Sequence, residues 1–189
     1  MELFLFIFYL IYIAMALTPL VVIFILQNRD IQIFIYKNIV FNNLIVTLCI
    51  IVLALLLSHL YIYCVKKYYQ NTQSELMECS EIEIAEPKYI PIYIAYFVIA
   101  VSINNLVIFS VVLILIYLLI LKGKFSYFNP YLLFSGYHFY EVSVDINREK
   151  YAKYKLFLIS KQKIKEMKSH NNLIRLNDFT FLDKGDRNG

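Results

Sequence analysis

The sequence predicts a mainly α-helical membrane protein, with four transmembrane helices within residues 1–122 and a small cytoplasmic β-rich module at residues 123–189. Two observations predict this class. Hydrophobic residues make up 60% of the 189 residues and charged residues 17%, whereas soluble domains are about 45–50% apolar and about 25% charged. The apolar residues also gather in runs long enough for a helix to cross a hydrocarbon layer about 30 Å thick.

The first two predicted helices are the apolar runs at residues 3–26 and 44–65. Pro19 lies inside the first run and is expected to kink it, because proline removes a backbone donor. A signal peptide is the alternative for this run, with the small residues around Ala16 as its cleavage site. The run continues well beyond Ala16, and no Lys or Arg precedes it, which favours a permanent helix.

The third apolar stretch, residues 89–121, is too long for one helix, because its 33 residues would extend about 50 Å. Asn104 and Asn105 lie near its middle. Placed at a turn, they divide the stretch into antiparallel helices at residues 89–103 and 106–121. The alternative is three crossings, with both amides inside one helix. The Lys and Arg beside the loops favour four crossings by three residues to two, which places both chain ends in the cytoplasm.

The acidic segment at residues 67–88 is expected to form a loop outside the membrane. It contains five Glu residues, whereas the chain from residue 122 onward holds thirteen Lys and Arg against seven Asp and Glu. In the four-helix arrangement the loop and the tail face one compartment, so we expect them to attract each other, within or between subunits. A cation site in the loop is less favoured, because such sites need convergent ligands held by a defined turn.

The β-rich module is predicted from alternating residue types in the tail. Residues 137–146 and 154–160 alternate with period two and contain many aromatic and β-branched residues, which predicts two strands that pair as a hairpin. Residues 173–182 predict a third strand. The charged residues 161–170 between them predict a short helix.

Polar residues inside the predicted helices are candidate functional groups: His59, Asn104 and Asn105. A polar group within a membrane suggests a proton relay or a pore. The alternatives are structural: His59 reaches the membrane surface, and the two amides form a turn. Four lysines of the tail could contact anionic lipid, at roughly 1 kcal/mol each, or form a solvated face: Lys161, Lys163, Lys165 and Lys168.

Motifs of enzymes are missing from the sequence: it contains no nucleophile elbow, phosphate-binding loop, zinc-protease motif or dinucleotide fingerprint. We therefore expect no catalytic residues and no cofactor. The three cysteines lack C-x-x-C spacing, so we expect no metal site either.

The tail contains N-P at residues 129–130, L-L at 132–133, GYHFYEV at 136–142 and LISK at 158–161. In these residues it resembles the C-terminal part of the KwaA family, the membrane subunits of the Kiwa anti-phage defence system of bacteria. The order of elements, several membrane helices and then a short β-rich segment, is also similar. The resemblance covers mostly the last third of the chain, and its motif is structural, so it identifies no catalytic residue.

The resemblance implies a multi-pass protein of the bacterial inner membrane that forms a homo-oligomer, for example a tetramer, and senses phage attack at the envelope. It also implies a partner, a soluble KwaB-like DNA-binding effector subunit that the cytoplasmic side recruits, with no direct nucleic-acid binding by this chain. The acidic loop and the β-rich module would be the docking surfaces. The candidate docking residues are Glu81, Glu83, Tyr137, His138, Phe139, Tyr140 and Glu141.

Other functions compete with this hypothesis. The residues of the predicted strands could equally form the core of the module. A pore or transporter component is supported by His59 and by the Asn104–Asn105 pair, if these side chains face an oligomeric channel. A third hypothesis is an immunity-type accessory membrane protein that the tail merely anchors.

Overall fold

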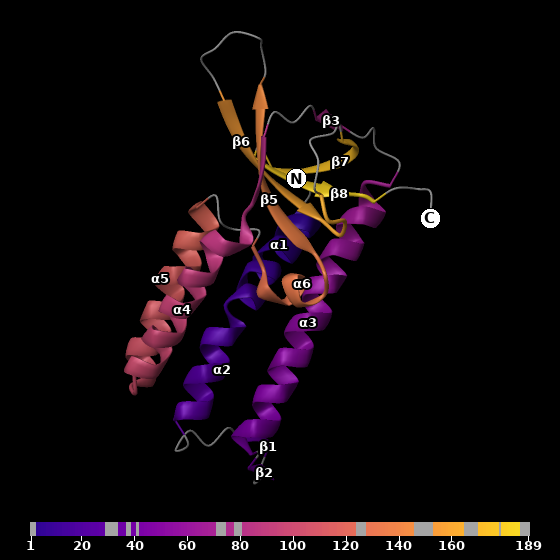
Figure 1. Cartoon of the computed structure of the whole chain (residues 1–189). Coiled ribbons are helices and arrows are strands. Elements are labelled where there is room, and N and C mark those ends of the chain that lie inside the picture. Colours follow the sequence, from indigo (N-terminus) through magenta and orange to yellow (C-terminus); the bar gives the residue numbers. More distant parts are fainter. Residues whose placement is uncertain are drawn as a thin grey trace. The chain divides into compact units, whose positions relative to one another are not determined.

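The computed structural model describes residues 3–28, 34–36, 39–40, 42–70, 75–77, 81–123, 128–145, 153–164, 170–177 and 179–185. These residues form helices and strands in mixed order (Figure 1). The helices are α1 (Leu3–Ala16), α2 (Thr18–Gln27), α3 (Asn43–Tyr68), α4 (Glu86–Ser102), α5 (Leu106–Lys122) and α6 (Pro130–Phe134). The strands are β1 (Phe34–Tyr36), β2 (Ile39–Val40), β3 (Glu75–Met77), β4 (Glu81–Ile84), β5 (His138–Asp145), β6 (Lys153–Ser160), β7 (His170–Asn177) and β8 (Thr180–Asp183).

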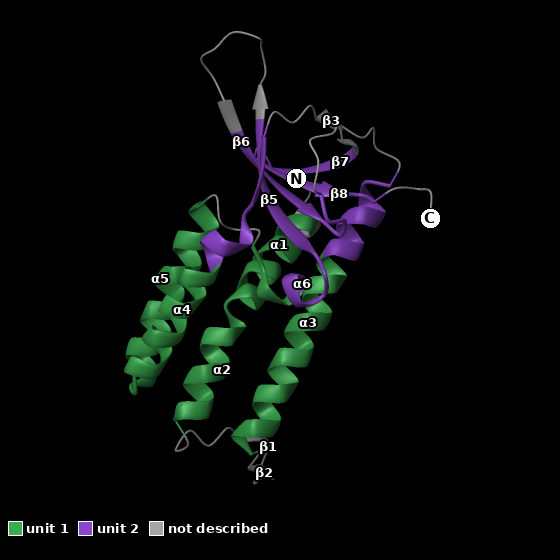
Figure 2. Cartoon of the chain, viewed as in Figure 1, with its two compact units in different colours: residues 1–61, 90–131 green, residues 62–89, 132–189 purple. Residues whose placement is uncertain are grey.

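The chain divides into two compact units (Figure 2). The first, here called the helical unit, contains residues 1–61 and 90–131. The second, here called the β-module, contains residues 62–89 and 132–189. The helices α3, α4 and α6 each contribute residues to both units.

The helical unit has a bent N-terminal helix pair. The axes of α1 and α2 differ by 42° across Leu17, and Pro19 stands in the first turn of α2. Proline cannot donate the helical hydrogen bond at this point, which explains the break. Beyond the bend, the Phe24 ring stacks on the Phe109 ring of α5 with centroids 3.8 Å apart. The cluster around this pair consists of Leu20, Phe24, Ala100 and Phe109.

A tight turn at residues 103–105 separates α4 from α5. The side-chain oxygen of Asn105 accepts hydrogen bonds from the backbone N–H groups of Val107 and Ile108, at 2.9 and 3.1 Å, and so caps α5. The Asn104 oxygen accepts from Gln27 Nε2 at 3.0 Å. Both amides therefore serve the turn and its contact with α2.

The predicted class, a mainly α-helical protein with four transmembrane helices, is wrong. Among the described residues only α3, with 26 residues, is long and apolar enough to cross a membrane alone, and the bent pair α1–α2 raises the number to at most two. The helices α4 and α5 have 17 residues each, or about 25 Å, which is shorter than a hydrocarbon layer. The bend expected at Pro19 and the turn expected at Asn104 and Asn105 are both present, but apolar composition did not predict how few of the resulting helices are long enough to cross a membrane.

The β-module is built on a mixed six-stranded sheet with the strand order β3-β7-β8-β6-β5-β4. All neighbours are antiparallel except β6 and β8, which run parallel. The two strands β3 and β4 come from the acidic segment that was expected to be a loop, so this segment and the tail share one sheet. The core of the sheet is formed by Tyr140, Val142, Leu158, Leu173 and Phe181.

The tail differs from its prediction after β6. The hairpin of β5 and β6 forms in the expected part of the chain, but the expected third strand at residues 173–182 is two antiparallel strands, β7 and β8. The side chain of Asn177 accepts from the N–H of Phe179 at 2.8 Å and favours this turn. The expected helix at 161–170 does not form at residues 161–164, and His170 begins β7. Residues 165–169 lie outside the described residues.

Candidate functional site

The first candidate site is a group of charged side chains, here called the charged edge: Glu81, Glu83, Lys88, Glu141 and Lys155. Among the described strands β4 is a terminal strand of the sheet, and its Glu83 lies directly opposite Glu141 of β5. Like charges in this position destabilise a sheet. Lys88 offsets the repulsion, because its Nζ lies 2.7 Å from Glu83 Oε2 and 2.6 Å from Glu141 Oε2.

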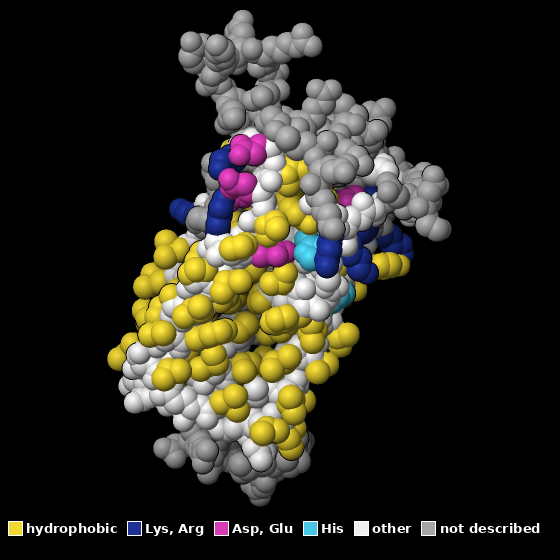
Figure 3. All heavy atoms as spheres, viewed as in Figure 1, with side chains coloured by type: hydrophobic (Ala, Val, Ile, Leu, Met, Phe, Trp, Pro, Cys, Tyr) yellow, Lys and Arg dark blue, Asp and Glu magenta, His cyan; other side chains and the backbone are white. Residues whose placement is uncertain are grey.

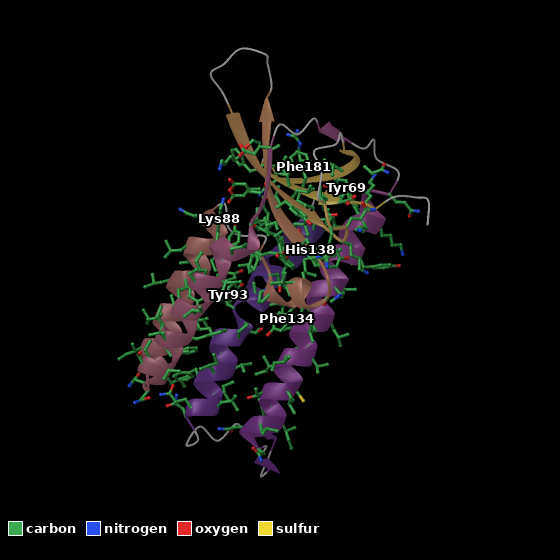
Figure 4. All side chains as sticks on the ribbon, in the orientation of Figure 1. Tyr69, Lys88, Tyr93, Phe134, His138 and Phe181 are labelled. Atoms are coloured by element: carbon green, nitrogen blue, oxygen red, sulfur yellow. The ribbon has the colours of Figure 1, made fainter. Side chains whose placement is uncertain are left out.

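The start of α4 holds Lys88 in this position (Figure 4). The N–H of Ala85 donates to the carbonyl of Phe139 at 2.8 Å and extends the pairing of β4 with β5 by one residue. Glu86 then accepts from the N–H of Phe139 at 3.3 Å, and its carboxylate lies 3.1 Å from His138 Nδ1. The first turn of α4 is thereby fixed to β5, and Lys88 reaches both carboxylates from it.

The opposite charges of this edge stabilise each other's ionised forms. The hydrogen bond from Lys88 holds the pKa of the Glu83 carboxyl below its ordinary value, and the two carboxylates raise the pKa of Lys88. A lowered carboxyl pKa contributes stability at neutral pH that is lost as the pH falls through that pKa. The raised pKa of Lys88 keeps its charge well into the alkaline range. The bridge is therefore complete at neutral pH and is broken by acid.

Replacing Lys88 by glutamine is expected to lower the melting temperature of the purified chain slightly, by about 1–3 °C at neutral pH. Glutamine leaves Glu83 and Glu141 facing each other without a cation. The difference from the unchanged chain should vanish in acid, where the carboxyls become neutral. Lys155→Gln is the matched control, because Lys155 Nζ is 3.8 Å from Glu141 and 60% exposed. An equal loss in both variants, or a loss that persists in acid, would contradict the bridge.

The second candidate site is a set of polar contacts inside the helical unit, here called the kink network: Thr18, Ser58, Tyr93, Asn129 and Tyr131. Because Pro19 has no N–H, the carbonyl of Met15 lacks its helical donor. The Thr18 hydroxyl donates to this carbonyl at 2.7 Å. Since the Thr18 hydrogen is used there, the Tyr131 hydroxyl donates to Thr18 Oγ1, at 2.5 Å.

The next carbonyl of the kink has a separate donor. The N–H of Leu20 bonds to Leu17, at 3.0 Å, instead of to Ala16, so the Ala16 carbonyl is left over. The Tyr93 hydroxyl of α4 donates to it at 3.3 Å (Figure 4). Side chains thus satisfy both carbonyls that the bend releases from the helix.

Asn129 extends the network to α3. Its side-chain nitrogen donates to Ser58 Oγ at 3.0 Å, and its oxygen accepts from the N–H of Tyr131 at 2.9 Å. Both Asn129 and Ser58 are fully buried. The network therefore connects the bend of α1–α2 with α3, α4 and α6 through hydroxyl and amide groups. These groups can hold or release a bend, and they carry no charge.

Comparison with known proteins decides the family. A family model described as "Anti-phage protein KwaA" matches residues 8–182, which include most of both units. The chain belongs to the KwaA family. KwaA proteins act in anti-phage defence, and the resemblance noted in the tail is thereby confirmed. No curated protein and no solved structure gives a significant match.

The β-module of this KwaA chain separates the candidate docking residues into two groups. The rings of Tyr137, Phe139 and Tyr140 are buried. The Tyr140 hydroxyl also accepts from the N–H of Ile164 at 3.0 Å, which helps to fix the segment after β6. These aromatic side chains belong to the core of the module. The accessible candidates are Glu81 and Glu83, which are exposed, and His138 and Glu141, which are half-buried.

The remaining candidates of the KwaA chain are dispersed. His59 is exposed on α3, and its Nδ1 lies 2.9 Å from the Leu55 carbonyl of the same helix. Lys161 and Lys163 are exposed, whereas Lys165 and Lys168 lie outside the described residues. Within the described part of the chain, no group of three or more His, Cys, Asp or Glu side chains is placed to hold a metal ion.

No local motif of the sequence marks the central residues of either site. The pairing of Lys88 with Glu141 spans 53 residues, which is beyond the reach of a local pattern. Thr18 stands beside Pro19 in an apolar run, and Asn129 precedes Pro130. A polar residue beside proline in an apolar segment was the available signal for the kink network in this KwaA chain.

Proposed function

We propose that this KwaA-family chain is a non-enzymatic subunit of the bacterial inner membrane, which senses phage attack there and recruits a cytoplasmic DNA-binding effector. The observation that carries the proposal is the apolar surface of the helical unit (Figure 3). Large aliphatic side chains of α5 are 49–72% exposed: Leu106, Val107, Ile108, Val111, Ile114, Leu115, Leu118 and Leu119. The helices α3 and α4 expose similar side chains. Soluble monomers rarely expose continuous apolar surface on this scale.

Lipid covers these faces in the proposed state, and further copies of the chain cover part of them in a homo-oligomer. The proposal does not depend on a number of crossings. It needs α3 to cross the bilayer and the apolar faces of α4 and α5 to lie in it. The charged edge belongs to the β-module, and charged residues favour water, so the module lies outside the lipid. In the proposed state this side is the cytoplasm.

The kink network is the proposed sensing element. The bend of α1–α2 is held by hydrogen bonds from side chains of other helices, which a change in helix packing can exchange for others. Disturbance of the membrane by a phage then shifts the population of bent and straighter forms. Tyr93 and Asn129 pass such a shift to α4 and α3, because they contact the bend directly or through Tyr131.

The charged edge is the proposed docking surface for the effector. The outer side of β4 carries exposed Glu81 and Glu83, and Ile84 beside them is 59% exposed. A DNA-binding protein has a basic surface, which complements this acidic strand and increases the rate of encounter.

Cysteine labelling tests the membrane placement in the full chain. After the native cysteines are replaced by serine, Leu115→Cys should react with a membrane-impermeant maleimide only after the membrane is dissolved. The matched control, Lys155→Cys, should react in inverted inner-membrane vesicles but not in spheroplasts, because its position is exposed on the β-module. Equal labelling of both positions in intact vesicles would refute the proposal, as would labelling of position 155 from outside the cell.

A further inference from the structure

The end of α3 has the composition of a membrane–water boundary. The apolar run of this helix ends at Val65, and Lys66 and Lys67 stand in its last turn. Tyr63 and Tyr68 in the same region are 60% and 47% exposed. Tyrosine is enriched at the level of lipid headgroups, and a helix C-terminus favours cations. The last turn of α3 therefore suits the headgroup layer.

The β-module brings another lysine to this turn. The half-buried ammonium of Lys66 donates to the backbone carbonyl of Lys184 at 3.2 Å. Its charge interacts with those of Asp183 and Lys161. Lys161 follows β6, and its Nζ lies 5.8 Å from the centre of the Tyr137 ring. Lys66 and Lys161 thus come from distant parts of the sequence, and their positive charges lie close enough in the β-module to interact.

Among the described residues, the carboxylate that acts on Lys66 is that of Asp183. The carboxylate of Asp183 accepts hydrogen bonds from Ser160 Oγ at 2.6 Å and from the N–H of Gly185 at 2.8 Å. Glu83 and Glu141 of the same module pair instead with Lys88. One carboxylate therefore faces two lysines, which favours an anion with several oxygen atoms.

We propose that Lys66 and Lys161, with Lys67 beside them, bind the headgroup of an anionic phospholipid, whose phosphate oxygens accept hydrogen bonds from the ammonium groups. This inference rests on the membrane placement proposed above. A lipid is favoured over a nucleic acid because Lys66 directly follows the apolar run of α3, at the level that headgroups occupy. A headgroup held there connects the end of α3 with the ends of β6 and β8. The lipid composition of the membrane then affects how firmly the β-module is held to α3.

Native mass spectrometry of the full chain in detergent micelles tests the proposal, with phosphatidylglycerol and phosphatidylcholine as probes. Phosphatidylglycerol should be retained in preference to phosphatidylcholine. Lys66→Gln and Lys161→Gln should each weaken its binding about 5-fold, and the double variant roughly 30-fold, as expected for about 1 kcal/mol per lysine. Glutamine keeps a donor for the Lys184 carbonyl. Lys155→Gln removes the same charge near the other end of β6, roughly 20 Å away, and should leave the binding unchanged.

Three results would overturn the inference. The first is equal retention of the two lipids, and the second is an equal loss in the Lys155→Gln control. The third is displacement of the lipid by an oligonucleotide at equal charge concentration, which would identify a general polyanion site. A chain that resists labelling at Leu115→Cys but shows no lipid preference refutes this inference alone. A chain that is labelled there in intact membranes refutes the proposed function.

Discussion

Replacing Phe139 by alanine is expected to destabilise the β-module by about 3–5 kcal/mol and to abolish protection against phage. The Phe139 ring is fully buried in the module and stacks on Phe157 with centroids 5.8 Å apart. Its backbone also bonds to Ala85 and Glu86, where β4 leads into α4. Removal of the ring leaves a cavity at this junction. Small domains are stable by only about 5–15 kcal/mol, so the loss is a large part of the total.

Pulse proteolysis of the purified full chain in detergent micelles measures this loss, and phage plating measures protection. Glu81→Lys is the informative contrast, because Glu81 is exposed at the edge of the sheet. This variant should keep the protease resistance of the unchanged chain but fail to retain a co-expressed KwaB-like subunit on membranes. If Phe139→Ala kept its protease resistance and lost only the partner, Phe139 would be a docking residue after all.

The aromatic strand shows what alternation in a sequence can and cannot establish. Period two predicted a strand around Phe139 and Tyr140, and β5 lies there. Alternation does not tell which of the two faces is covered, and in this module both rings are buried although they point to opposite faces. Whether these rings are free to dock depends on other segments that pack near them, and the local sequence does not show those segments. They are the start of α4, which bonds to Phe139, and the segment around Ile164, which bonds to Tyr140.

The acidic segment shows the same limit over a longer distance. It was expected to be a loop, but Glu81–Ile84 form β4, which is terminal among the described strands. Its register against β5 joins residues about 60 positions apart, and local patterns carry no information on such pairing. The breaks in the apolar runs left local signals. Pro19 predicted the bend that lies at Leu17, and Asn104 with Asn105 predicted the turn at residues 103–105.

Replacing Asn129 by leucine is expected to destabilise the helical unit by about 2–5 kcal/mol, and a second substitution should partly restore it. Leucine has a similar size but leaves the Ser58 hydroxyl and the Tyr131 N–H without their partners, at about 1–3 kcal/mol for each buried group. Ser58→Ala in the same chain removes one of these two groups. The double variant should therefore be more stable than Asn129→Leu alone, at a cost of about 1–3 kcal/mol.

Denaturant unfolding of the four chains in micelles, as a double-mutant cycle, measures this coupling. Partial rescue would show that Ser58 and Asn129 act as a pair inside the kink network, whereas additive losses would contradict the pairing. Phage plating adds the functional readout. If the network sets the bend that senses the membrane, the double variant should regain stability but not full protection, because its apolar pair no longer joins α3 to the bend. Full protection in the double variant would restrict the network to a structural role.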